Sequence, residues 1–100
     1  MGAVEPVWQK QRYDYHLSLS LLQLENLQFY FTGDRQQLAN ADMYAKRAFM
    51  LSPTDPQIYT DYAQTLVYEN NTAGAKKLLA MAIELNPNYF VAEQFLKELQ

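Results

Sequence analysis

Few side chains in this sequence are of the types that carry out chemistry. There is one histidine, His16, and there is no cysteine, so the sequence offers no thiolate zinc site, no cysteine nucleophile and no disulfide framework. It also lacks a phosphate-binding loop and a nucleophile motif. His16 stands alone at the start of a long apolar segment, where we interpret it as a packed or exposed side chain. We therefore expect no enzyme activity, no metal site and no cofactor.

Two further groups of side chains would need to converge before they could act. Asp61 and Glu98 would make a carboxylate pair if the fold brought them together across a groove. No cleft that excludes water is evident, so we interpret them as side chains that line a groove without a catalytic role. Met43, Met50 and Met81 could hold copper only if they met at one point. We expect them to fill gaps in the core instead.

Length and composition indicate one small domain. The chain has 100 residues, 49% of them hydrophobic, a net charge of −3 and scattered basic residues, which makes a nucleic-acid partner improbable. No apolar run is long enough to span a membrane, so we expect no direct membrane insertion. Gly2 suggests myristoylation, but Pro6 stands where that motif has Ser or Thr. We expect a soluble module, cytoplasmic or the periplasmic domain of a longer anchored protein; the compartment is left open.

The segments that carry these residues are predicted to be helices, because Gly and Pro are few and widely spaced in the sequence. Residues 1–7 are expected to be a flexible N-terminus. Residues 8–33 predict a long leading helix, with a break near residues 13–16 as an alternative. One apolar stripe at helical spacing consists of Tyr13, Leu17, Leu21, Leu24, Leu27 and Phe31. A second stripe, Leu19, Leu22, Phe29 and Tyr30, implies that the helix is covered from more than one side.

Residues 34–53 predict the next helix, with Asp34 as its N-cap and Gln37 completing a capping box. A third helix follows the N-cap Asp55, and a fourth is expected to be capped by Thr72. Residues 88–100 predict a last helix. The fold class is therefore all-α, with about five helices in tandem antiparallel hairpins within a single domain, residues 8–100.

A repeat of 34 residues organises this array. Ala41, Ala48, Leu51 and Pro53 recur as Ala75, Ala82, Leu85 and Pro87. With this pattern the sequence resembles the tetratricopeptide (TPR) family. The match is strongest over residues 56–89, and the large, small and proline positions of the family pattern are occupied by Tyr59, Tyr62, Ala63, Leu66, Ala75, Leu79, Ala82 and Pro87.

The other segments depart from the family pattern. Residues 34–53 match only the second helix of a divergent repeat, and residues 88–100 look like a capping helix. The resemblance implies a right-handed superhelix with a concave groove. A further likeness, to TPR subunits of bacterial cytochrome c maturation, lies in Asp55 to Ala63 and Ala82 to Asn88.

The resemblance also implies which side chains line the groove. These are Gln57, Thr60, Asp61, Gln64, Val67, Tyr68, Val91, Gln94 and Phe95, with Gln23, Leu27 and Tyr30 from the leading helix. None is Lys or Arg, which disfavours the TPR class that clamps carboxylates. For Tyr68 and Phe95, packing under neighbouring side chains is an equal alternative.

We therefore expect a protein-interaction module that binds a peptide or partner segment, as an adaptor or an assembly or chaperone factor. The alternative is a structural module that self-associates as a homodimer through its apolar ends, Leu19, Leu22, Phe29 and Tyr30 on one side and Phe95 and Leu96 on the other.

Overall fold

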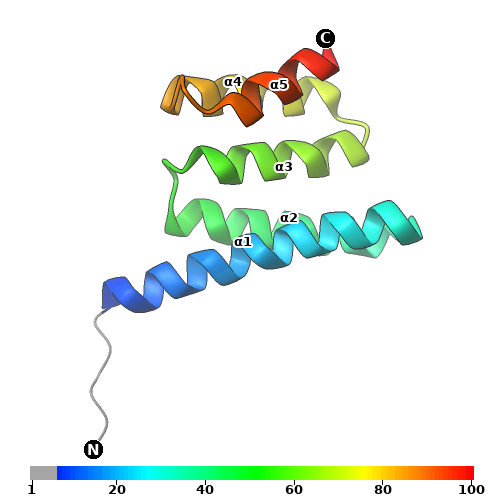
Figure 1. Cartoon of the computed structure of the whole chain (residues 1–100). Coiled ribbons are helices and arrows are strands. Elements are labelled where there is room, and N and C mark those ends of the chain that lie inside the picture. Colours follow the sequence, from blue (N-terminus) through cyan, green and yellow to red (C-terminus); the bar gives the residue numbers. More distant parts are fainter. Residues whose placement is uncertain (1–6) are drawn as a thin grey trace, which may run out of the picture.

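The computed structural model describes residues 7–100 as an all-α chain of five helices (Figure 1). They are α1 (Val7–Thr32), α2 (Arg35–Leu51), α3 (Pro56–Tyr68), α4 (Thr72–Leu85) and α5 (Phe90–Leu99). The all-α class and the number of helices are confirmed. Helix α1 runs through residues 13–16 without a break. Residues 1–6 of the expected flexible N-terminus lie outside the described residues, whereas Val7 already belongs to α1.

The helices form two layers. In Figure 1, α1, α3 and α5 lie side by side in front, and the fainter α2 and α4 lie behind α1 and α5. Helix α1 packs chiefly on α2, α3 on α4, and α4 on α5, as expected for antiparallel hairpins joined by short turns. The front layer places α3 between α1 and α5, so it is the helix around which a site can form.

Three of the predicted helix starts can be compared with the structure. Asp34 and Asp55 are the N-caps of α2 and α3, and their carboxylates accept hydrogen bonds from the backbone N–H groups of Gln36 and Gln57. The predicted capping box is wrong, because the Gln37 side chain lies against Thr32 and Gln28 instead. The prediction for α4 is also wrong by one residue. Asn71 is the cap and accepts from the N–H of Gly74.

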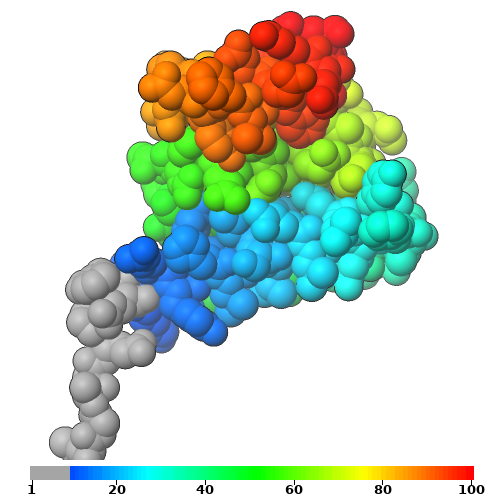
Figure 2. All heavy atoms as spheres, in the orientation of Figure 1, coloured from blue at the N-terminus to red at the C-terminus, as the bar shows by residue number. Residues whose placement is uncertain are grey.

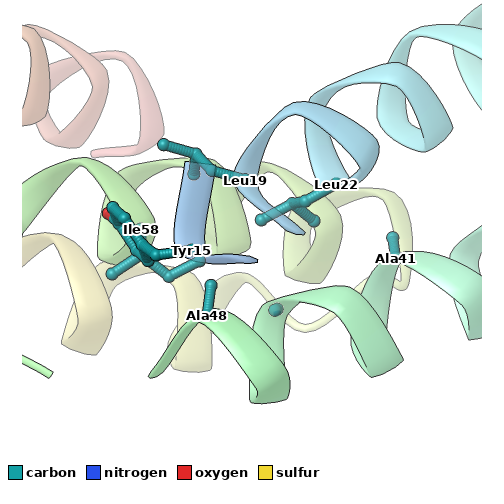
Figure 3. Close-up of a cluster of buried hydrophobic side chains, with 7 residues drawn as sticks. Tyr15, Leu19, Leu22, Ala41, Ala48 and Ile58 are labelled. Carbon is teal, nitrogen blue, oxygen red and sulfur yellow. The ribbon is translucent and has the colours of Figure 1, made fainter. Parts of the chain in front are cut away.

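The first core cluster joins α1 to α2 and to the start of α3. Its side chains are fully or almost fully buried: Tyr15, Leu19, Leu22, Ala41, Ala45, Ala48 and Ile58. Figure 3 shows the side chains of α1 lying over the alanines of α2. The alanines let the backbones of α1 and α2 approach closely, since no bulky side chain separates them. The Phe49 ring packs edge-on against Tyr59 and Tyr62, which ties this cluster to α3.

The second core cluster joins α3, α4 and α5 through Ala63, Ala75, Leu79, Ala82 and Ala92, all fully buried. It contains the alanines of the 34-residue pattern that belong to residues 56–89. Tyr59 packs against both clusters, so the two cores meet at α3. Small residues at helix–helix contacts thus determine how closely the whole array packs.

Two sequence expectations about exposed apolar residues are wrong. Met50 is 85% exposed and Met43 55%, so these methionines do not fill core gaps, and Met81 is also exposed. The apolar end assigned to Leu19, Leu22, Phe29 and Tyr30 is wrong for Leu19 and Leu22, which are buried inside the α1–α2 hairpin; of the four, Tyr30 is largely exposed. The outward face of α1 carries the other apolar stripe, which runs from Tyr13 to Phe31. Two-sided apolarity was recognised in the sequence, but periodicity alone does not tell which side faces the core.

Candidate functional site

Helices α1, α3 and α5 line an open groove of about 420 Å³, which we call the α1–α3–α5 groove. In Figure 2 the green-to-yellow surface of α3 lies between the blue-to-cyan surface of α1 and the orange-to-red surface of α5. The groove is lined by Gln23, Asn26, Leu27, Tyr30, Thr60, Asp61, Gln64, Tyr68, Val91 and Phe95. A second hollow of about 470 Å³ shares Gln64, Val91 and Phe95 with it and extends along α5.

The structure brings nine of the twelve predicted groove residues to this one site: Gln23, Leu27, Tyr30, Thr60, Asp61, Gln64, Tyr68, Val91 and Phe95. Gln94 lines only the neighbouring hollow. Two predicted residues lie elsewhere. Gln57 is exposed at the start of α3, and Val67 packs against the second core cluster.

A polar network forms the floor of the groove between α1 and α3. The Gln23 amide donates to the Asp61 carboxylate at 2.8 Å, and the Asn26 amide donates to the backbone carbonyl of Asp61 at 3.1 Å. Behind it, the Thr65 hydroxyl donates to the Asn26 carbonyl oxygen at 2.8 Å in a buried position. Because each member is paired, this network holds α1 at a defined position along α3.

Aromatic side chains form the walls. The rings of Phe29 and Tyr68 lie with centroids 5.0 Å apart, which holds the Tyr68 ring beside α1. Burial raises the pKa of the Tyr68 hydroxyl, with a smaller contribution from Tyr30. Phe95 on α5 is half-buried and packs against the second core cluster. Each ring therefore packs inward with one side and faces the groove with the other, so packing and groove lining are not exclusive roles.

Asp61 gives the groove its charge. Burial raises the pKa of its carboxyl, an effect that the hydrogen bond from Gln23 partly offsets and that the negative charge of Asp55 reinforces. None of the ten lining residues is Lys or Arg. A desolvated carboxylate without a cation beside it is a site that gains from a positively charged ligand.

The structure also places the other side chains that the sequence singled out, Glu98 and His16. Within residues 7–100 no group of three or more His, Asp or Glu side chains could hold a metal ion. Asp61 and Glu98 line different hollows. His16 is exposed and lines a polar hollow with Arg12 and Asp55, whose carboxylate already accepts a hydrogen bond from Tyr15 at 2.6 Å. None of the helices in this range is long and apolar enough to cross a membrane.

Sequence reasoning missed Asn26 and Phe90. Phe90 is the first residue of α5 and lines the neighbouring hollow while being largely exposed. Asn26 lies at helical spacing between Leu22 and Phe29 on the inward-facing stripe of α1, and a polar residue on such a stripe is a signal of a buried hydrogen bond. That signal was present in the sequence.

Comparison with protein-family models, with curated proteins and with solved structures found no match. The resemblance to the TPR family therefore remains a prediction, as does a right-handed superhelix.

Proposed function

We propose that this chain is a non-enzymatic interaction module that holds a linear peptide segment of a partner protein in the α1–α3–α5 groove. The observation that carries the proposal is the groove itself. Residues from three helices that are far apart in the sequence converge on one open, largely aromatic and amide-lined surface. Aromatic anchors beside paired polar groups are the usual composition of a peptide-binding surface.

The lining indicates the chemistry of the ligand. Tyr68, Val91 and Phe95 would receive an apolar or aromatic side chain, and the Gln64 amide can pair with a peptide backbone. Asp61 would pair with a lysine or arginine of the ligand, because a cation returns to this carboxylate the stabilisation that burial removes. We therefore propose a ligand segment in which a basic residue stands next to an apolar one.

The test is selection of peptides from a displayed library of random linear sequences, with the full chain as bait. We expect enriched peptides that combine Lys or Arg with Phe, Leu, Trp or Tyr. Val91→Glu would abolish their binding, because Val91 is 57% exposed and lines both hollows. The matched control is Met50→Glu, the same kind of change at an exposed apolar residue of α2, and it should leave binding unchanged.

A second variant tests the charge. Asp61→Asn keeps an acceptor for Gln23 but removes the negative charge, so it should weaken basic peptides about tenfold and leave neutral analogues unaffected. Selection of acidic peptides, or binding that survives Val91→Glu, would contradict the proposal.

A further inference from the structure

Helix α1 carries a second apolar face that the fold leaves uncovered. Tyr13, Leu17, Leu24, Leu27 and Phe31 are between 46% and 76% exposed. Together with Ser20 they form one row, which we name the α1 seam. Large aromatic side chains have about 150–250 Å² of surface and aliphatic ones less, so these exposed fractions amount to on the order of 500 Å² of apolar surface. The largest apolar patch on a soluble monomer has about 300–600 Å² and is often functional.

The spacing in the α1 seam is that of a coiled coil. From Tyr13 to Phe31 the steps along the chain alternate between four and three residues, which is the heptad pattern of two helices that interdigitate side by side. Tyr15 and Leu22, both buried in the first core cluster, occupy the positions opposite this row. The seam therefore points away from the core of its own chain, and a partner helix can approach it without disturbing the fold.

We infer that the α1 seam pairs with the α1 seam of a second copy of this chain, with the two helices antiparallel. In that arrangement Tyr13 lies level with Phe31 of the second copy, Leu17 with Leu27, and Ser20 with Leu24. Each layer then matches side chains of similar or complementary size. A parallel pair would instead place the two small Ser20 side chains in the same layer and leave that layer underpacked, whereas the antiparallel pair fills it with Leu24.

Charge and area favour a second copy over a different protein as the occupant. Partner choice in helix pairs is set by charges beside the seam, yet of the six flanking residues only Asp14 is charged at pH 7; they are Asp14, His16, Leu21, Gln23, Gln28 and Tyr30. Nothing there repels an identical helix or selects an oppositely charged one. A standard interface buries about 800 Å² per partner. The exposed apolar side chains of the seam supply about 500 Å² of this by the same estimate.

The α1 seam and its flanks share three residues with the groove, which are Leu27 of the seam and the flanking residues Gln23 and Tyr30. Leu27 belongs to the α1 seam and also lines the α1–α3–α5 groove, so pairing covers the α1 edge of the groove and leaves the α5 side open. Leu17 and Leu24 do not line the groove. Variants at these two positions therefore test pairing independently of peptide binding.

The experiment is light scattering on the full chain over a range of concentrations. We expect twice the mass of one chain for the wild type and for the control Met50→Glu. The double variant Leu17→Glu, Leu24→Glu should have the mass of one chain with an unchanged circular dichroism spectrum, since both residues are exposed in the monomer. A wild type with the mass of one chain at all concentrations, or a dimer that survives the double variant, would overturn the inference.

Disulfide crosslinking tests the orientation without relying on the double variant. The chain has no cysteine, so introduced thiols are unique. We expect a mixture of Ser20→Cys and Leu24→Cys chains to crosslink with each other on mild oxidation. Crosslinking of Ser20→Cys with itself in preference would overturn the antiparallel arrangement, and no crosslink in any combination would overturn the pairing.

Discussion

The two sides of α3 are joined to the rest of the molecule in different ways. On the α1 side, four hydrogen bonds that involve side chains connect α1 to α3 or to its N-cap: Tyr15 to Asp55, Gln23 to Asp61, Asn26 to the Asp61 backbone, and Thr65 to Asn26. On the α4 and α5 side the centre is the wholly apolar cluster of four alanines and Leu79. The apolar contacts and the hydrogen bonds therefore have different roles.

Apolar burial supplies stability, since it scales with area and has no preferred direction. Hydrogen bonds add less free energy but require particular atoms to face each other, so they determine how α1 sits along α3. The groove lies on the side that the polar contacts align. A binding site whose walls come from separate helices depends on that alignment more than on total stability.

The largest expected effect is on the apolar side. Leu79→Ala should lower the free energy of unfolding by about 3 kcal/mol, because the side chain is fully buried and the neighbouring alanines cannot collapse into the space. Urea unfolding followed by circular dichroism measures it. Met81→Ala on the same helix is the control and should change stability by no more than about 0.5 kcal/mol. Equal losses at the two positions would contradict the described core.

The buried polar pair comes next. Asn26→Leu should cost about 2 kcal/mol, because it leaves the buried Thr65 hydroxyl without its acceptor and removes the amide that donates to the Asp61 carbonyl. Thr65→Val should cost slightly less. The double variant should lose about 1 kcal/mol less than the sum of the two, since each single change already breaks the shared hydrogen bond. Additive losses would show that the two side chains do not interact.

A smaller effect is expected at the end of α1. Tyr15→Phe should cost about 1.5 kcal/mol, because its hydroxyl donates to the Asp55 carboxylate at 2.6 Å and Asp55 also caps α3. The matched control is Tyr59→Phe, which removes an equally short hydrogen bond to the Pro53 carbonyl at an exposed position. There the loss should be about 0.5 kcal/mol, since water replaces the bond. A larger loss of stability at Tyr59 than at Tyr15 would contradict the greater contribution that we assign to the Tyr15 hydrogen bond.

The same contrast explains what the sequence could predict. Apolar periodicity, the alanines 34 residues apart and the Asp55–Pro56 start signal predicted the helices and their order, because these are local or repetitive features. Most groove residues on α3 followed from the register of one well-matched repeat. The inward position of Asn26 could be seen in the sequence, but its hydrogen-bond partner could not, because Thr65 lies 39 residues further along the chain.

The errors have related physical causes. For α1 both apolar stripes have helical spacing, and which one is buried depends on where α2 and α3 lie. Met43 and Met50 carry apolar side chains but lie on the outer face of α2, where hydrophobicity alone does not place a residue. Gln57 and Val67 were assigned to the groove from the family pattern, and they lie outside it.

The smallest effect concerns pH at the junction of α2 and α3. The Glu69 carboxyl, at the C-cap of α3, has its pKa raised from 4.5 to about 7 by burial, by a hydrogen bond to Asp42 and by the negative charge of Asp42, while Arg35 and Lys46 act in the opposite direction. The folded state therefore holds a proton that the unfolded state releases above pH 4.5. This contribution to stability is complete below pH 4.5 and is lost as the pH rises through 7.

Because Glu69 is only partly buried, solvent reduces the contribution to about 1 kcal/mol. Glu69→Gln removes the titration, so its stability relative to the wild type should rise by that amount between pH 4.5 and pH 8, measured by urea unfolding at each pH. Asp42→Asn should reduce the same pH dependence, since it removes the charge that repels ionised Glu69. Glu93→Gln, in the exposed ion pair with Lys97, is the control for loss of a surface carboxylate. A wild type and a Glu69→Gln variant with parallel pH profiles would show that Glu69 and Asp42 do not interact in the folded chain.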